Sequence, residues 1–143
     1  MAEKLQKLVV VTPARVVFTD EVRMVVARGV EGELGILPDH APLITRLKTD
    51  VVRIQKDGQW RVMAVSNGFL EVKNNQVTIL ADAAELAEEI DVERARRAKE
   101  RAEERLRART PDIDIARAEA ALMRALARLK AVELAQRYRG TAR

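Results

Sequence analysis

The sequence predicts an α+β protein whose strands and helices are segregated: an N-terminal antiparallel β-sandwich followed by a C-terminal antiparallel hairpin of two helices. One reason is a change of composition near residue 84. Five of the six glycines and three of the four prolines precede it, whereas the residues after it are rich in Ala, Arg, Glu and Leu, which favour helix. The second reason is that the first part holds short Val-rich runs separated by turn signals, with no helical stretch between them. We therefore expect two domains, a sandwich of residues 1–84 and a helical hairpin of residues 85–143.

The first part reads as short strands alternating with turns. The expected strands are residues 7–12, 15–19, 21–28, 51–55, 60–66, 69–73 and 76–80. Asp57-Gly58 lies between two alternating runs and predicts a tight hairpin, because Gly accepts positive φ at little cost. Asn67-Gly68 predicts a similar turn, and Asn74-Asn75 leads into the last strand. Since aromatic residues are few, the core must be built from Val, Ile, Leu and Ala.

The second part reads as two helices. Asp91 can cap the first, which runs to about residue 109 and carries a face of small residues. Thr110 as cap and Pro111 as the first helical residue then restart the second helix. Its apolar stripe comprises Ile115, Ala118, Leu122, Ala125, Leu126, Leu129 and Val132. So short a break favours an antiparallel hairpin, and an alanine-rich seam buries little area. We expect the hairpin to be marginal alone and able to detach from the sandwich.

Several kinds of chemistry are excluded by what the sequence lacks. No cysteine is present, which removes disulfides, thiolate metal sites and cysteine nucleophiles. His40 is the single histidine, so we expect no His-rich metal site and treat it as a surface or packed residue. No phosphate loop of the GxxxxGKS or GxxxxGKT type occurs. No run of about 18 apolar residues occurs, and the first seven residues are polar, so we expect a cytosolic chain.

Arginines on the predicted helices are the most informative residues. Asp91, Arg94 and Arg101 fall within an arc of about 80° on the first helix. Arg124 and Arg128 lie four residues apart on the second, and antiparallel packing could bring the two sets together. Converging guanidinium groups repel one another unless an anion is present, and polyphosphate suits the planar fork of Arg. The alternative is that Asp91 is only a helix cap and the arginines belong to ordinary ion pairs on a solvated helix.

The net charge of +4 raises the question of a nucleic-acid partner. Acidic residues are interspersed with the basic ones, and the helical part has no aromatic residue to stack on bases except Tyr138. The charge pattern therefore fits an acidic protein partner better than a phosphate backbone.

Three segments carry a resemblance to a known family. They are residues 32–43 (GELGILPDHAPL), 65–72 (VSNGFLEV) and 77–81 (VTILA). With the order of the two parts, they resemble the epsilon subunit of bacterial F-type ATP synthase over nearly the whole chain. Asp39 departs from the family pattern, which usually has Gly before the His. The chain after about Glu133 is longer than in the relatives, and the sequence assigns that tail no role.

The resemblance implies a non-catalytic rotor subunit of the central stalk that helps couple proton flow to ATP synthesis. Such a subunit lies at the cytoplasmic face of the bacterial cell membrane and touches the membrane only through the complex. The family's sandwich binds the gamma subunit and the c-ring, and the loop with Glu31, Glu33 and His40 matches the part that faces the ring. The hairpin permits ATP hydrolysis when it is folded on the sandwich. It blocks ATP hydrolysis when it extends into the alpha and beta subunits, where its basic second helix meets acidic segments of beta.

Some family members also bind ATP on the folded hairpin through an Ile-Asp-x-x-Arg-Ala motif. Here the motif is Ile90-Asp91-Val92-Glu93-Arg94-Ala95. The positions that complete such a site are Glu85, Arg101, Arg124 and Arg128. The resemblance implies ATP as a regulatory ligand and does not decide whether Mg2+ accompanies it.

Two other functions stay open at this point. One is a purely structural coupling subunit whose hairpin binds no nucleotide. The other is a nucleic-acid-binding adaptor with a basic hairpin, which would bind DNA or RNA with a steep salt dependence.

Overall fold

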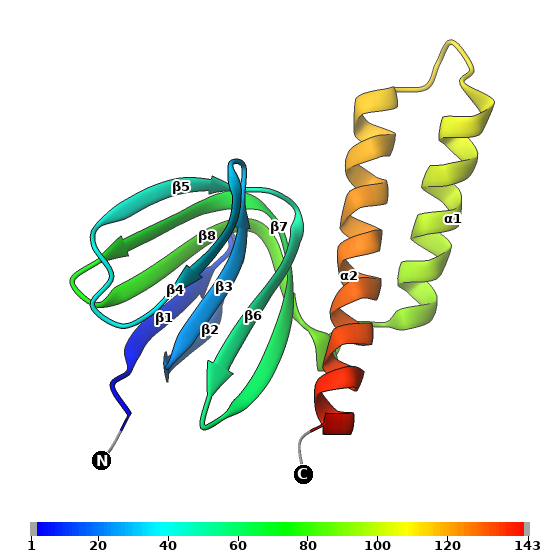
Figure 1. Ribbon diagram of the computed structural model, residues 1–143. Coiled ribbons are helices and arrows are strands. Elements are labelled where there is room, and N and C mark those ends of the chain that lie inside the picture. Colours follow the sequence, from blue (N-terminus) through cyan, green and yellow to red (C-terminus); the bar gives the residue numbers. More distant parts are fainter. Residues whose placement is uncertain (1–2, 142–143) are drawn as a thin grey trace.

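Strands fill the N-terminal part of the chain and two long helices the C-terminal part, as the composition predicts (Figure 1). The computed structural model describes residues 3–141. The strands are β1 (Gln6–Val11), β2 (Val16–Val22), β3 (Met24–Gly29), β4 (Gly32–Ile36), β5 (Leu43–Leu47), β6 (Asp50–Lys56), β7 (Gln59–Lys73) and β8 (Gln76–Leu86). The helices are the short 3-10 helix η1 (Ala87–Glu89), α1 (Val92–Ala108) and α2 (Ile115–Thr141). The predicted sandwich and hairpin are therefore confirmed, with β8 continuing past residue 84.

The sandwich is built from one bent sheet that closes over a common core. Its hydrogen-bonded order is β2-β1-β8-β7-β5-β3-β4, and β6 pairs with both β3 and β7. Paired strands are antiparallel except β1 and β8, which run parallel and were not predicted to do so. Fully buried side chains include Leu8, Ile36, Ile54, Met63, Leu70 and Ile79. Aliphatic residues thus supply nearly all of the core, as the shortage of aromatic residues requires.

Two predicted turns are confirmed, and both use residues that tolerate positive φ. Asp57 (φ 52°) and Gly58 (φ 74°) connect β6 to β7. Asn74 (φ 50°) and Asn75 (φ 59°) connect β7 to β8. Positive φ at both central residues is the pattern whose twist matches two paired strands, so these turns set the register of the central hairpins.

The predicted turn at Asn67-Gly68 is wrong, because both residues lie inside the continuous strand β7. At this point β7 changes neighbours: β6 pairs with it up to Val65, and β5 pairs with it from Gly68 onwards. Asn67 has a φ of 35°, so the local signal marks a kink inside a long strand instead of a reversal. A β-carbon at Gly68 would lie 2.0 Å from the carbonyl oxygen of Leu80, which means that β8 passes too close for any side chain.

The predicted strand over residues 21–28 is divided in the structure. β2 ends at Val22 and pairs with β1, whereas β3 begins at Met24 and pairs with β4, β5 and β6. Arg23 lies between them, and its backbone N–H donates to the carbonyl of Gln55 at 2.8 Å. The interruption allows one β-forming segment to serve two different parts of the sheet.

The first helix begins where the capping signal predicts. Oδ1 of Asp91 accepts a hydrogen bond from the backbone N–H of Arg94 at 3.1 Å. Arg109 ends the helix in the left-handed conformation, with φ 45°, and its N–H donates to the carbonyl of Arg105. Both ends of α1 are therefore satisfied by local contacts.

The second helix begins later than predicted, because Thr110 is not its cap. The carbonyl of Thr110 accepts from the N–H of Ile113 at 3.0 Å, which closes a turn that reverses the chain. Asp114 then caps α2 by accepting from the N–H of Arg117 at 3.0 Å. Asp is as good a cap as Thr, and only the later start leaves enough chain for the reversal.

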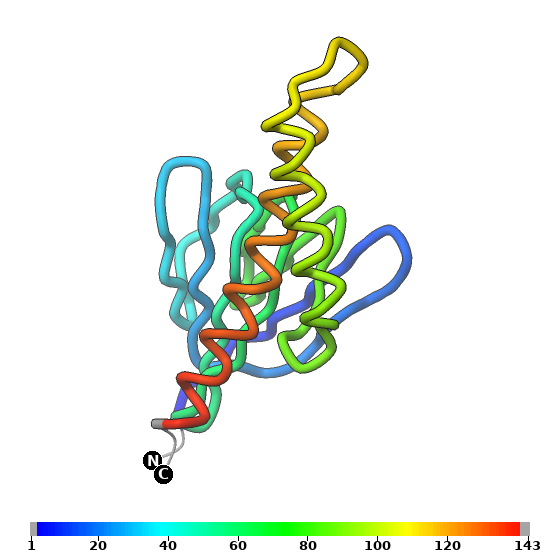
Figure 2. The backbone as a smooth tube through the Cα atoms, turned by 90° about the vertical axis from the view of Figure 1, so that its right-hand side faces the viewer, coloured from blue at the N-terminus to red at the C-terminus, as the bar shows by residue number. Residues whose placement is uncertain are grey.

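Helix α2 lies between the sandwich and α1 (Figures 1 and 2). It contacts α1 on one side and strands β6 and β7 on the other. Its C-terminal half packs on β6 and β7. Ala127 and Ala131 are buried there against Val51 and Val62, whereas Leu126 of the predicted stripe is 38% exposed. The face that docks on the sandwich is thus rotated from the predicted one. Its buried residues are alanines, and Leu129, Val132, Leu134, Ala135 and Tyr138 pack around them partly buried.

Candidate functional site

A hollow of about 730 Å³ lies where the end of β8, the start of α1 and helix α2 meet. Its lining residues are Ala83, Glu85, Glu89, Asp91, Arg94, Ala95, Arg97, Ala98, Arg101 and Arg128. These residues come from β8, η1, α1 and the connection between them, and from α2, which is distant from the others in the sequence. The hollow therefore has this lining only while the hairpin is folded against the sandwich.

Most of the residues predicted for a nucleotide site line this hollow. They are Glu85, Asp91, Arg94, Ala95, Arg101 and Arg128. Ile90 and Arg124 are not in the lining. Ile90 is buried in the apolar cluster that joins the hairpin to the sandwich, and Arg124 is half-buried on α2, one turn before Arg128.

Four arginines and the three carboxylates of Glu85, Glu89 and Asp91 line the hollow, which leaves a formal excess of one positive charge. Nε of Arg128 donates to Oε1 of Glu85 at 2.5 Å, which ties α2 to the end of β8. Within residues 3–141, the guanidinium groups of Arg94, Arg97 and Arg101 have no hydrogen-bonded or ion-paired partner. Three unpaired cations on one helix face create a positive potential that favours an anion at this place.

Asp91 has a structural role that the sequence already offered as an alternative. Its Oδ1 is used by the N–H of Arg94 at the start of α1. The carboxylate also borders the hollow, and its Oδ2 is not used by the cap. Both interpretations of Asp91 are compatible with this geometry.

Arg97 and Glu89 also line the hollow and were not predicted from the sequence. Arg97 lies three residues after Arg94 and four before Arg101, so the helical period alone places it on the same face. Oε1 of Glu89 accepts from the N–H of Leu86 at 3.3 Å and so helps to shape the η1 turn between β8 and α1. No sequence signal identified Glu89, because its position depends on where β8 ends.

The residues predicted to face a c-ring do not share one loop. Glu31 lies in the turn before β4, Glu33 on β4 itself and His40 in the connection after it. All three are exposed or half-exposed, and Glu33 accepts from Nη2 of Arg53 at 3.2 Å. The Nδ1 atom of His40 lies 2.7 Å from the carbonyl oxygen of Ala41, and its backbone N–H donates to the carbonyl of Leu37 at 3.2 Å. The strand separates Glu31 from His40, which the expectation of a single loop did not foresee.

Near His40, Asp39 adopts the conformation that explains the usual glycine of the family. Its φ of 62° is in the left-handed region, which Asp tolerates better than most residues. Its N–H donates to Oδ1 of Asn75 at 2.8 Å, and its carboxylate pairs with Lys4. The turn is therefore kept despite the departure from the family pattern.

The outer face of the sandwich carries exposed apolar side chains. Phe69 of β7 and Leu80 of β8 are paired across the strands and are 50% and 53% exposed. Ile44 of the neighbouring β5 is 71% exposed. These three side chains form an outer apolar patch that a partner surface could cover.

The hinge between sandwich and hairpin is held by Arg61. Its Nη2 donates to Oε1 of Glu88 at 2.5 Å, and its guanidinium lies over the ring of Phe18, 5.4 Å from the centroid. Partial burial of Glu88 disfavours its ionised form, but the hydrogen bond from Arg61, a backbone hydrogen bond and the positive charges of Arg61 and Arg139 together hold the pKa of that carboxyl below its usual value. The ion pair thus fixes η1, from which α1 departs.

Over the described part of the chain, no cluster of three or more His, Asp or Glu side chains could hold a metal ion. None of the described helices is both long and apolar enough to cross a membrane.

Solved structures confirm the fold. A chain of the Euglena gracilis mitochondrial ATP synthase, in a structure of OSCP, F1 and the c-ring, has a TM-score of 0.76 and 23% identity, covering 93% of this chain and 84% of that one. A chain from the central stalk and c-ring structure of the Tetrahymena thermophila mitochondrial ATP synthase has a TM-score of 0.54 and 16% identity, covering 96% of this chain and 98% of that one.

Family models match both parts of the chain. The beta-sandwich domain of the ATP synthase delta/epsilon chain matches residues 5–87, and the long alpha-helix domain of the same chain matches residues 88–133. The chain therefore belongs to the ATP synthase delta/epsilon family. The ATP synthase epsilon chain of Desulforamulus reducens is 55% identical over 91% of this chain and 98% of its own length, and that of Moorella thermoacetica is 60% identical over 87% and 93%. Within the family it is thus an epsilon subunit of the bacterial F-type enzyme.

Proposed function

We propose that the chain is a non-catalytic rotor subunit in which the hairpin senses ATP and regulates ATP hydrolysis. The observation that carries the proposal is the arginine-rich hollow between hairpin and sandwich, which unites six of the residues that the family motif implicates. ATP would act there as a regulatory ligand.

The hollow has the chemistry that a nucleoside triphosphate requires. Arg94, Arg97 and Arg101 offer unpaired guanidinium groups for the phosphates. The carboxylate of Asp91, at the N-terminus of α1, can accept a hydrogen bond from a ribose hydroxyl or a base amino group.

Ligand binding at this hollow would favour the folded hairpin. A ligand that binds only the folded state stabilises it by about 2.7 kcal/mol at a hundredfold excess over its Kd. The alanine-rich docking face of α2 gives the folded state only a modest advantage of its own. Free energies of this size can move a balanced equilibrium almost completely to one side.

The sandwich would join the hairpin to the rotor. We assign the outer apolar patch (Ile44, Phe69, Leu80) to contact with the gamma subunit of the central stalk, and the region of Glu31, Glu33 and His40 to the c-ring. The extended hairpin would reach the alpha and beta subunits, and the complex would hold the chain at the cytoplasmic face of the membrane.

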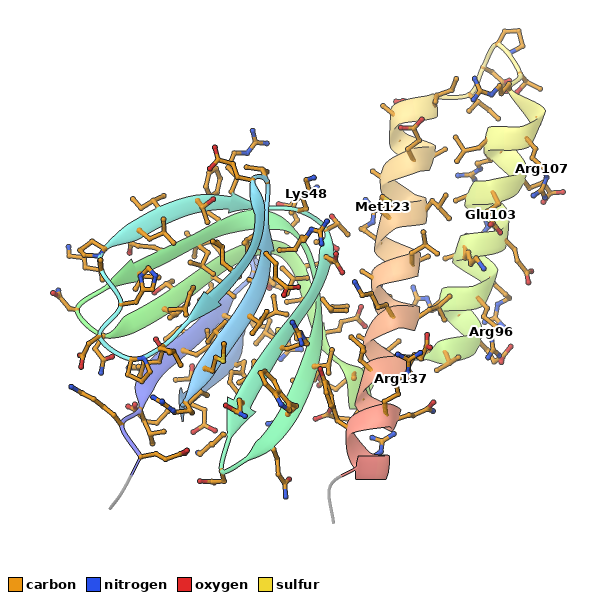
Figure 3. The ribbon with its side chains drawn as sticks, viewed as in Figure 1. Lys48, Arg96, Glu103, Arg107, Met123 and Arg137 are labelled. Carbon is orange, nitrogen blue, oxygen red and sulfur yellow. The ribbon has the colours of Figure 1, made fainter. Side chains whose placement is uncertain are left out.

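Replacing Arg94 with alanine is expected to weaken ATP binding by about tenfold to a hundredfold, because a charge-assisted contact to phosphate is lost. Calorimetric titration of the full chain with ATP measures the change. Arg107→Ala is the matched control, since Arg107 lies on the outer side of α1, away from α2 (Figure 3). Equal affinities of the Arg94 and Arg107 variants would contradict the site, and absence of ATP binding by the wild-type chain would favour a purely structural coupling subunit.

Replacing Asp91 with serine is expected to weaken ATP binding while α1 stays intact. Serine still caps a helix but carries no carboxylate, whereas Asp91→Ala also loses a cap worth about 1 kcal/mol. Circular dichroism measured beside the titration separates the two effects. If the serine variant binds ATP as the wild type does, Asp91 is a cap and not a ligand.

A further inference from the structure

The last turns of α2 lie beyond the part of the chain that the family model matches. That match ends at residue 133, whereas α2 continues to Thr141. In this extension Leu134, Ala135 and Tyr138 pack against the apolar cluster that contains Val62 of the sandwich. The extension is therefore docked on the sandwich and adds to the folded-hairpin interface.

Tyr138 makes the most specific of these contacts. Its ring stacks on Trp60 of β7, with centroids 5.9 Å apart and an interplanar angle of 23°. The guanidinium of Arg53 lies over the same Trp60 ring, 5.6 Å from its centroid, and Nη1 donates to the hydroxyl of Tyr138 at 3.4 Å. Arg53 is oriented in turn by its ion pair with Glu33. Three elements, β6, β7 and α2, thus meet in one cluster.

We propose that Arg53, Trp60 and Tyr138 form a latch that sets how often the hairpin leaves the sandwich when no nucleotide is bound. In the rest of the α2 docking face the buried residues are alanines, and Leu129, Val132 and Leu134 are only partly buried, so the stacked rings of Tyr138 and Trp60 add the largest side chains to this contact. Tyr138 follows Arg128 by ten residues, about 15 Å along the helix axis. The latch and the arginine-rich hollow therefore hold α2 at two separate places.

This inference rests on the proposed function in one respect, namely that the hairpin opens. The two devices differ in what they respond to. The hollow stabilises the folded hairpin when an anion binds there. The latch binds no ligand, so its contribution to the folded state does not change with the ATP concentration. The length of α2 beyond Glu133 would then tune the switch without any change in the ATP site.

The test measures hairpin opening in the full chain carrying Tyr138→Ala. Because the chain has no cysteine, spin labels can be attached only at introduced ones, at the exposed positions Lys48 between β5 and β6 and Met123 on α2 (Figure 3). We expect the ratio of long to short label distances without ATP to rise by about tenfold, from the loss of an aromatic pair and its buried area. Trp60, the single tryptophan, should shift its emission to longer wavelength in the same variant.

Three comparisons complete the design. Gln136→Ala, on the exposed side of the same turn, should leave the ratio unchanged, and Tyr138→Phe should keep most of the closure because it retains the ring. Truncation after Glu133 should open the hairpin at least as much as Tyr138→Ala. An unchanged distance ratio in both Tyr138→Ala and the truncated chain would overturn the latch.

Adding ATP to the same samples separates the two proposals. If ATP shortens the distances in every variant but Tyr138→Ala does not lengthen them, the latch is wrong and ATP sensing stands. If Tyr138→Ala lengthens them and ATP changes nothing, the latch stands and ATP sensing is wrong.

Discussion

Replacing Gly68 with alanine is expected to lower the free energy of unfolding of the sandwich by about 3 kcal/mol, at the upper end of what overpacking usually costs. The added β-carbon would lie 2.0 Å from the carbonyl oxygen of Leu80 and 2.9 Å from Cα of Ala81. Both are backbone atoms of the central strand β8, which is held by β1 on its other side. Neither strand can move away without breaking a ladder, so the clash cannot be relieved cheaply. Denaturant unfolding of the full chain measures the loss.

Gly140→Ala is the matched control for this substitution. A β-carbon there meets nothing within 4 Å, and alanine is the better helix former, so no loss of stability is expected. An unfolding free energy for Gly68→Ala within about 0.5 kcal/mol of the wild type would mean that the close approach of β7 and β8 is wrong.

Replacing Arg128 with alanine is expected to reduce ATP affinity by about a hundredfold, which corresponds to about 2.7 kcal/mol. Two losses combine. A charge-assisted contact to the nucleotide disappears, and Glu85 keeps its negative charge beside the phosphates with its partner removed. The same change removes a tie between α2 and β8, so the hairpin should also open more often without ATP. Calorimetric titration and the spin-label distances report the two effects separately.

Arg124→Ala is the control that the structure supplies. Arg124 carries the same charge on the same helix but is not among the lining residues, so its loss should change ATP affinity much less. If the Arg124 and Arg128 variants lose equal affinity, the nucleotide does not occupy this hollow in the way described.

Local chemistry explains which parts of the fold could be predicted. The turn at Asp57-Gly58 and the cap at Asp91 depend on neighbouring residues alone, and both are confirmed. Asn67-Gly68 carries the same signal as a hairpin, yet its backbone serves a kink where β7 passes from β6 to β5. That outcome depends on strands far away in the sequence, which a two-residue signal cannot reveal.

The start of the second helix also could not be predicted from local signals. Thr110-Pro111 and Asp114 are both acceptable starts, and propensity does not choose between them. The choice is made by the reversal of the chain between α1 and α2, which needs the residues from Thr110 to Ile113.

In the candidate site, too, features set by local spacing could be predicted, whereas contacts between distant residues could not. Arginine spacing on α1 follows from helix geometry, so Arg94 and Arg101 were found from the sequence and Arg97 could have been. The pairing of Arg128 with Glu85 joins residues 43 positions apart. The stacking of Tyr138 on Trp60 likewise depends on how α2 docks, and the sequence held no sign of it.

The central claim is that ATP holds the hairpin against the sandwich. The most direct test is the distance between spin labels at Lys48 and Met123, measured in the full chain over a range of ATP concentrations up to millimolar. We expect the short-distance population to grow with ATP in the wild-type chain, and we expect Arg128→Ala to shift this growth to an ATP concentration about a hundredfold higher. A distance distribution that is already short without ATP and does not change as ATP is added would contradict it.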